Sequence, residues 1–155
     1  MAGRTDTAHR VIEAPASAIY RAMISAPALE QWLPPKGMTG QMLEFEPRPG
    51  GHYRLALRYD DKQIDGKSGD STDIVAVRFV VLVPDHSVVQ EVDFISDDPR
   101  FAGTMTMRWL LAPEGTGTRV TIIAENVPEG ISAADHAEGF AASLQNLADY
   151  VVADP

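Results

Sequence analysis

Apolar and polar residues alternate along the middle of the chain with a period of two. One face of residues 52–59 carries four large apolar or aromatic residues, namely Tyr53, Leu55, Leu57 and Tyr59. This alternation is typical of an antiparallel strand with one buried face. Similar alternation, or a run of β-branched residues, predicts further strands at residues 7–12, 41–46, 74–83, 86–95, 101–111 and 118–126. We expect the polar residues 60–73 to form a long exposed loop.

The C-terminal region carries the clearest helical period. Its apolar residues recur at spacings of one, three and four, namely Ala137, Phe140, Ala141, Leu144, Leu147, Ala148 and Val151. Ser132, followed three residues later by Asp135, is a capping signal for the start of this helix. Two shorter helices are predicted at residues 16–25 and 27–32.

The order of these elements predicts the fold class. One strand, two short helices and six strands precede the long helix. The apolar face of such a sheet needs a cover, and the long amphipathic helix is the only predicted element large enough to supply it. We therefore expect an α+β helix-grip fold, with a curved antiparallel sheet of about seven strands around the C-terminal helix. Residues 1–155 are predicted to form one domain.

Composition and charge narrow the classes of partner. The 155 residues include 13 Lys and Arg against 22 Asp and Glu, giving a net charge of −9. This balance disfavours nucleic acids and anionic lipid surfaces as partners. The chain has no cysteine, which excludes disulfides and thiolate metal sites. Residues 1–10 lack the apolar core of a secretory signal and no run is long enough to span a membrane, so we expect a cytoplasmic protein without membrane insertion.

The sequence contains few residues that could bind a metal or act in catalysis. The four histidines have no metal-ligand spacing, so neither a metal nor a cofactor is predicted: they are His9, His52, His86 and His136. Ser143 lies within a helix and no nucleophile elbow is present, which favours a small packing residue. His136 precedes Phe140 by one turn. It is either a proton carrier at a cavity mouth or a surface residue of the first helical turn.

Charged residues on the predicted strands alternate with apolar ones. We expect them on the outer face of the sheet, where they form ion pairs between strands: Arg54, Arg58, Glu91, Asp93 and Arg108. The inward positions of the strands then carry only tyrosine and tryptophan as polar types.

An ordered set of short motifs resembles a known family. It consists of residues 9–15 before a helix, the segment 29–34, the turn 45–54, the hairpin 115–121, and Gly139-Phe140 with Ser143-Leu144, Leu147 and Tyr150. Together they resemble the START-like, birch-pollen-allergen-like (SRPBCC) superfamily. The branch they resemble is named after the C-terminal domain of activators of the heat-shock chaperone ATPase. The resemblance implies a helix-grip fold with a cavity between sheet and long helix, and it does not imply chaperone activation.

The inward-facing residues define the predicted ligand site. They are mostly apolar, with adaptable methionines and with aromatic residues that carry a polar tip. The predicted ligand-binding residues are Trp32, Phe45, Tyr53, Leu55, Leu57, Phe94, Met105, Met107, Trp109, Phe140 and Leu144. The two short helices and the loop around Gly37 are expected to gate the entrance.

Three functions are compatible with these observations. The first is binding of a hydrophobic or amphipathic small molecule, such as a lipid, in the cavity. The second is a cyclase or hydrolase that uses the same cavity, with Tyr53, Tyr59 or His136 as proton carrier. The third is a chaperone-partner domain that docks through residues 60–73. Whether the protein is an enzyme, and whether it forms a homodimer, stays open at this point.

Overall fold

A single antiparallel sheet of seven strands frames the computed structural model, which describes residues 4–35, 37–59, 72–94 and 98–153. In sheet order the strands are β1 (Arg4–Ile12), β7 (Gly117–Val127), β6 (Thr104–Glu114), β5 (Ser87–Phe94), β4 (Thr72–Val83), β3 (His52–Tyr59) and β2 (Met38–Phe45). The first strand of the chain therefore pairs with the last, and β1 and β2 form the two edges.

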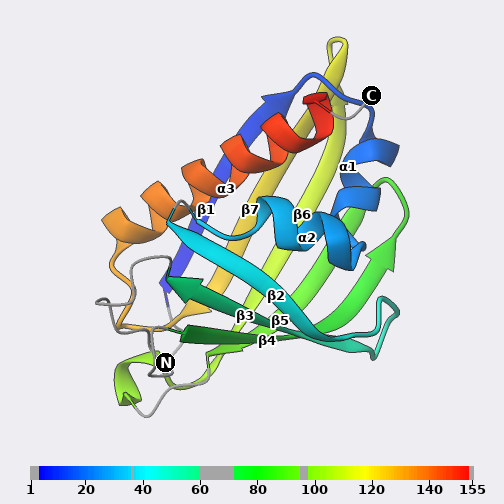
Figure 1. Ribbon diagram of the computed structural model, residues 1–155. Coiled ribbons are helices and arrows are strands. Elements are labelled where there is room, and N and C mark those ends of the chain that lie inside the picture. The colour runs from blue at the N-terminus through cyan, green and yellow to red at the C-terminus, as the bar shows by residue number, and fades with distance from the viewer. Residues whose placement is uncertain (1–3, 36, 60–71, 95–97, 154–155) are drawn as a thin grey trace.

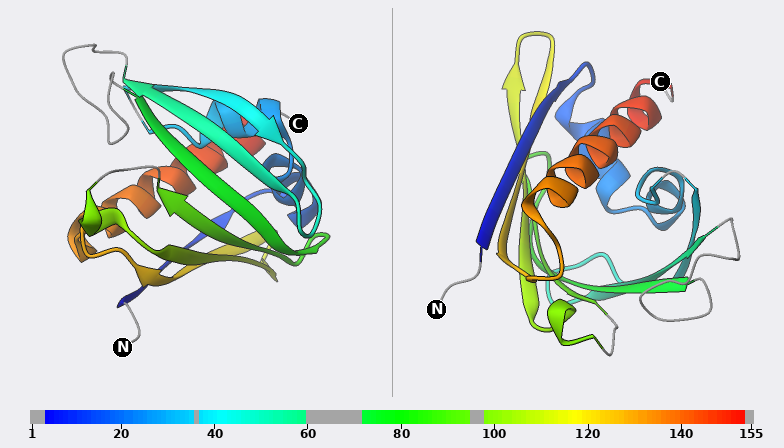
Figure 2. Two further views of the ribbon diagram at one scale, coloured as in Figure 1. Left: turned by 90° about the horizontal axis from the view of Figure 1, so that it is seen from below. Right: turned by 90° about the vertical axis from the view of Figure 1, so that its left-hand side faces the viewer.

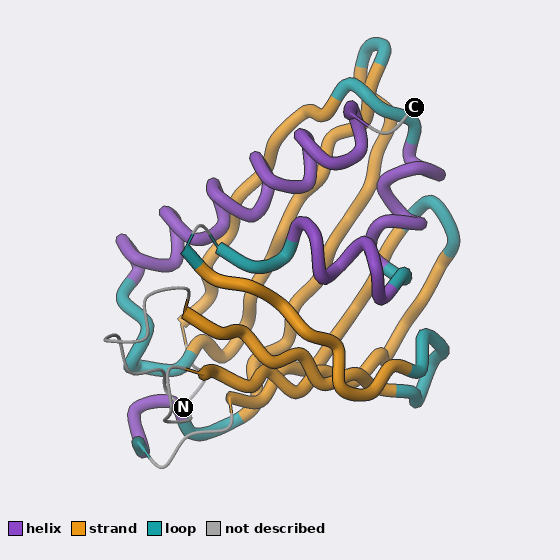
Figure 3. Tube along the Cα trace, in the orientation of Figure 1, coloured by secondary structure: helices purple, strands orange, loops and turns teal. Residues whose placement is uncertain are grey.

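Helices cover one side of this sheet. The long helix α3 (Ala133–Ala153) lies along the concave face (Figure 1). Helices α1 (Ala16–Met23) and α2 (Ala26–Trp32) connect β1 to β2, and a short 3₁₀ helix, η1 (Pro99–Phe101), precedes β6. Figure 2 shows from two sides how the sheet curls around α3, and Figure 3 shows the separation of helices and strands. The predicted α+β helix-grip fold is confirmed.

Bulges help the sheet to curve. The pairing of β2 with β3 shifts between Met42 and Glu44, and that of β4 with β5 shifts between Phe79 and Val81. An extra residue on one strand bends that strand and increases its twist. These two bulges lie in the half of the sheet away from β1, and the pairing of β1 with β7 also shifts between Arg4 and Asp6.

The apolar stripe of α3 faces the sheet. Its buried residues are Phe140, Leu144, Leu147, Ala148 and Val151. The expected cap is present, because Ser132 Oγ accepts a hydrogen bond from the backbone N–H of Asp135 at 3.0 Å. Ala137 and Ala141, which were assigned to the stripe, are exposed instead. His136 takes the buried position one turn before Phe140, in line with Phe140 and Leu144 at successive spacings of four residues.

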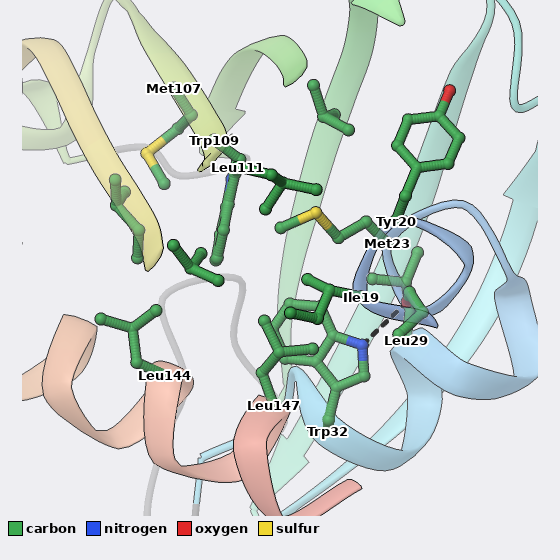
Figure 4. Close-up of a cluster of buried hydrophobic side chains, with 14 of the residues drawn as sticks. Ile19, Tyr20, Met23, Leu29, Trp32, Met107, Trp109, Leu111, Leu144 and Leu147 are labelled. Atoms are coloured by element: carbon green, nitrogen blue, oxygen red, sulfur yellow. Dashed lines mark hydrogen bonds between the residues drawn. The ribbon is translucent and has the colours of Figure 1, made fainter. Parts of the chain in front are cut away.

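The two short helices are joined more tightly than the sequence predicted. The helix expected over residues 16–25 ends at Met23, and Ser25 caps α2 by accepting a hydrogen bond from Ala28 N at 3.4 Å. Trp32 then donates from Nε1 to the backbone oxygen of Ala22 at 2.9 Å (Figure 4). This buried bond fixes α2 against α1.

Several strand boundaries differ from the prediction. β6 begins at Thr104 and not at Phe101, because Phe101 belongs to η1 and Gly103 turns the chain with a φ of 96°. β4 begins at Thr72, two residues before the expected start, while residues 60–71 of the predicted loop lie outside the described residues.

No helix in the described ranges is long and apolar enough to cross a membrane.

The outer face of the sheet carries the expected ion pairs. Arg78 Nη1 lies 2.9 Å from Asp93 and Nη2 lies 3.3 Å from Glu91, across the β4–β5 pairing. Arg108 Nε lies 2.8 Å from Glu125 across β6–β7. Such exposed pairs contribute only about 0–1 kcal/mol each, so the buried face dominates stability.

Packing of α3 on the sheet generates a first prediction. Leu147 is fully buried, and its replacement by alanine should lower the free energy of unfolding by about 2–5 kcal/mol, because a cavity remains where the side chain was. Urea denaturation measures this change. Val152→Ala on the same helix is the control, since Val152 is 57% exposed and should cost less than about 0.5 kcal/mol. Equal losses in both variants would contradict the assigned orientation of α3.

Candidate functional site

A cavity of about 290 Å³ lies between the sheet and the helices. Strands β3 to β6 supply its floor, α2 and the turn that follows it supply one wall, and α3 covers it. The sequence folds this way because alternate residues of each strand point to the concave face, and α3 directs its apolar stripe at them. The cavity is not fully enclosed.

Most residues of the predicted ligand site line this cavity. Eight of them do so, namely Trp32, Tyr53, Leu55, Leu57, Met105, Met107, Trp109 and Phe140. Rows of paired residues across the strands bring them together, as in the row formed by Tyr53, Val77, Val92 and Met105. The alternation in the sequence was sufficient to find the six of these residues that lie on strands, because it identifies the inward face of the sheet directly.

Three predicted residues are not placed at the cavity. Leu144 is 2% exposed and packs in the core between α3 and the sheet, away from the cavity lining. Phe45 packs against Tyr53 and Phe79, with ring centroids 6.0 and 6.3 Å apart, and so supports the wall from behind. The side chain of Phe94 lies outside the described residues.

Two tryptophans form a rigid part of the wall. The rings of Trp32 on α2 and Trp109 on β6 meet edge to face, with centroids 5.8 Å apart (Figure 4). The hydrogen bond from Trp32 to Ala22 holds the first ring in place. Aromatic pairs in this geometry add about 0.5–1.5 kcal/mol beyond the area they bury. This contact joins the short helices to the sheet at the cavity.

The inward face carries a polar residue that was not expected. Gln90 on β5 is buried between Val88 and Val92 and lines the cavity, so tyrosine and tryptophan are not the only polar types there. Its side chain interacts with the Tyr53 hydroxyl. Burial raises the pKa of Tyr53 far above its usual value, while the hydrogen bond from Gln90 opposes that rise. Tyr53 therefore stays a neutral hydroxyl. The alternation of Val88, Gln90 and Val92 was the signal that could have found this residue.

His136 faces the cavity and not the solvent. It is 9% exposed and lines the cavity beside Phe140, with ring centroids 4.0 Å apart. Its Nδ1 lies 2.7 Å from Oδ2 of Asp6 on β1. Of the two interpretations of His136, the structure places it at the cavity. The sequence prediction missed Asp6, because the predicted first strand began at residue 7, one residue after it.

Arg4 is the third member of the polar cluster that His136 and Asp6 form. Its Nε and Nη2 each donate to the Asp6 carboxylate at 2.9 Å, and Nη2 also donates to the backbone oxygen of Ile131. The hydrogen bonds from Arg4 are the largest influence on Asp6 and hold the pKa of its carboxyl below the usual value, while burial opposes them and His136 assists. Charged groups therefore do occur on the inner face of the sheet, on the edge strand that α3 covers.

Among the described residues no group of three or more His, Cys, Asp or Glu side chains is placed to hold a metal.

The lowered pKa of Asp6 leads to a second prediction. A depressed folded-state pKa stabilises the protein above the ordinary carboxyl value of 3.8, and this stabilisation is lost as the pH falls through the folded-state pKa. Asp6→Asn should therefore lower the free energy of unfolding by about 1–2 kcal/mol at a pH near 7. The difference from the wild type should shrink at a pH of about 3. Urea denaturation at both pH values measures it, and a difference independent of pH would contradict the ionised Arg4–Asp6 pair.

Known structures share this architecture. A crystal structure of a protein from Chromobacterium violaceum is 31% identical, with a TM-score of 0.84 over 95% of this chain and 96% of that one. A protein from Rhodobacter sphaeroides is 20% identical, with a TM-score of 0.78 over 99% and 97% of the two chains. A protein from Mycobacterium smegmatis is 17% identical, with a TM-score of 0.78 over 97% and 92%. The last two similarities, at such identities, concern the fold alone.

Sequence comparison identifies the family. No protein with a curated description matches the chain. Residues 13–152 match the model of the family described as activator of Hsp90 ATPase homolog 1-like proteins. This match spans most of the sequence, from the end of β1 to the last turn of α3, and it agrees with the START-like fold. The chain belongs to the family of activator of Hsp90 ATPase homolog 1-like proteins.

Proposed function

We propose that this protein binds a hydrophobic or amphipathic small molecule in the cavity between the sheet and α3. The observation that carries the proposal is a cavity of about 290 Å³ whose surface is mostly apolar, within a fold whose sheet and helix surround it. Sites for small molecules are commonly concave and apolar, with a few polar groups that orient the ligand. The volume suits a molecule with one or two rings or a short chain.

The lining residues support binding of this kind. Met23 on α1, and Met105 and Met107 on β6, line the cavity and adapt their shape easily, because the methionine side chain is unbranched and polarisable. Trp32 and Trp109 are held by their mutual edge-to-face contact and give a fixed aromatic surface. A ligand therefore meets one rigid aromatic wall and several adaptable ones.

The polar groups of the cavity are few and lie apart. Gln90 and Tyr53 interact with each other on the floor of the cavity. His136 belongs to α3 and lies near the edge strand β1. An apolar molecule that carries a polar group at one position fits this distribution. A strongly charged molecule does not, because the apolar surroundings would remove its hydration without replacing it.

The alternative functions have unequal support. An enzyme that uses the cavity has one specific observation in its favour, the buried His136 with its Asp6 partner, which is the arrangement that proton transfer requires. Docking of a chaperone through residues 60–73 depends on residues 60–71, which lie outside the described ranges. The chaperone partner, the homodimer and the cytoplasmic location stay predictions.

Filling the cavity should abolish binding. In Met107→Trp the larger side chain extends into the space that the ligand occupies, so the affinity for 2-methylnaphthalene should fall by at least about tenfold, or about 1.4 kcal/mol. Equilibrium dialysis with absorbance detection measures the affinity and the stoichiometry.

Leu110→Trp is the matched control for this experiment. Leu110 lies on the same strand, β6, but it is 38% exposed on the outer face of the sheet. This variant should bind 2-methylnaphthalene as the wild type does. Unchanged affinity and stoichiometry in Met107→Trp would remove the cavity from the proposal.

A further inference from the structure

A chain of polar side chains connects the edge strand β1 to the cavity. Arg4 holds the Asp6 carboxylate with two N–H groups, and Asp6 in turn contacts Nδ1 of His136 at 2.7 Å. Arg4 and Asp6 alternate with exposed threonines on β1, so both point toward α3. Three side chains from two elements thus meet at the covered edge of the sheet.

The charge of Asp6 determines where the proton of His136 lies. Arg4 keeps the pKa of the Asp6 carboxyl below its usual value, so the group is an ionised carboxylate at neutral pH. An ionised carboxylate only accepts hydrogen bonds, which requires Nδ1 of His136 to be the donor. In a neutral imidazole with the proton on Nδ1, the other nitrogen, Nε2, carries a lone pair and is an acceptor.

The other ring nitrogen of His136, Nε2, takes no part in these contacts. It has no hydrogen-bond partner among residues 4–35, 37–59, 72–94 and 98–153. In the same ranges no side-chain nitrogen or oxygen that is sealed from water lacks a partner, so Nε2 is not sealed. Since the ring is 9% exposed and lines the cavity, Nε2 is accessible from the cavity.

The ring is also held in one orientation. Asp6 fixes one edge, and Phe140 packs against the face of the ring at 4.0 Å between centroids, with 40° between the planes. Asp6 belongs to a row of paired residues that continues through Ala124 and Met107 to Gln90. Asp6, which orients the His136 ring, is therefore separated from Gln90 in this row by Ala124 and Met107.

We infer that Nε2 of His136 accepts a hydrogen bond from a hydroxyl group of the bound molecule, and that the ligands of this protein are apolar molecules bearing a phenol or alcohol hydroxyl. This inference rests on the proposed function and makes it more specific. A lone acceptor in an apolar wall selects for a donor, because an unpaired buried polar group costs about 1–3 kcal/mol. A ligand that offers only carbonyl oxygens leaves Nε2 without a partner.

A cycle of two ligands and two proteins tests the inference. 2-Naphthol and 2-methylnaphthalene have nearly the same shape but differ in the hydroxyl group. Equilibrium dialysis at a pH of about 8 gives the ratio of their association constants for the wild type and for His136→Phe. The ratio of naphthol to methylnaphthalene binding should be about tenfold higher in the wild type, the factor expected from one buried hydrogen bond. Comparing ratios cancels the different hydration of the two ligands.

His9→Phe is the matched control. His9 lies on β1 with its side chain exposed on the outer face of the sheet. The ratio of the two association constants in this variant should equal the wild-type ratio. A decrease as large as that in His136→Phe would assign the effect to general destabilisation and overturn the inference.

A second test uses only the wild-type protein, so its result does not depend on whether His136→Phe folds. Nitrogen-15 NMR of histidine-labelled protein should show His136 with a protonated Nδ1 and an unprotonated Nε2. 2-Naphthol should shift the Nε2 resonance toward that of a hydrogen-bonded nitrogen, and 2-methylnaphthalene should not. A proton on Nε2, or equal effects of the two ligands, would contradict the inference.

The outcomes separate this inference from the proposed function. If both ligands bind and the ratio is the same in the wild type and His136→Phe, the cavity binds apolar molecules and the role of His136 is wrong. If neither ligand binds to the wild type, the proposed function fails and the inference fails with it. Selective loss of the naphthol preference in His136→Phe supports both.

Discussion

One helix has to cover the concave face of a seven-stranded sheet, and the rest of the structure follows from that constraint. Leu144, Leu147 and Val151 fill the space where α3 lies close to the sheet. His136, Phe140, Ser143 and Asn146 of α3 instead face the space above strands β3 to β6, which their side chains do not fill. Helices α1 and α2 close part of it, held by the bond from Trp32 to Ala22. What remains is the cavity.

The polar side chains Gln90, Tyr53 and His136 line this apolar cavity, and each is held by a neighbouring residue. Gln90 interacts with the Tyr53 hydroxyl, so both satisfy part of their hydrogen-bonding capacity on the floor. His136 is oriented by Asp6, which is held by Arg4 from the same edge strand. Each polar group thus costs little folding free energy and keeps a defined orientation. This combination of apolar walls and a few oriented polar atoms is the feature on which the proposed binding function rests.

The sequence predicted the sheet, the long helix and eight residues of the cavity lining, because period-two and helical patterns report directly which side chains share a buried face. It failed at positions where that rule was applied too narrowly. Gln90 was missed because a polar residue on an inward position was not expected, and Asp6 because the first strand was taken to begin too late. His136 and Ala137 exchanged roles, since one residue along a helix rotates a side chain by about 100°. The pairing of Asp6 with His136 joins residues 130 positions apart in the sequence, and only the fold brings them together.

Native mass spectrometry of the freshly purified protein, followed by release under denaturing conditions, tests the central claim most directly. If the cavity holds an apolar small molecule, the native mass should exceed the mass of the chain by one ligand. Unfolding should release that ligand, and its accurate mass should be that of a hydrophobic compound. Protein that carries no adduct, and that takes up none when it is incubated with a mixture of apolar and hydroxylated small molecules, would contradict the claim.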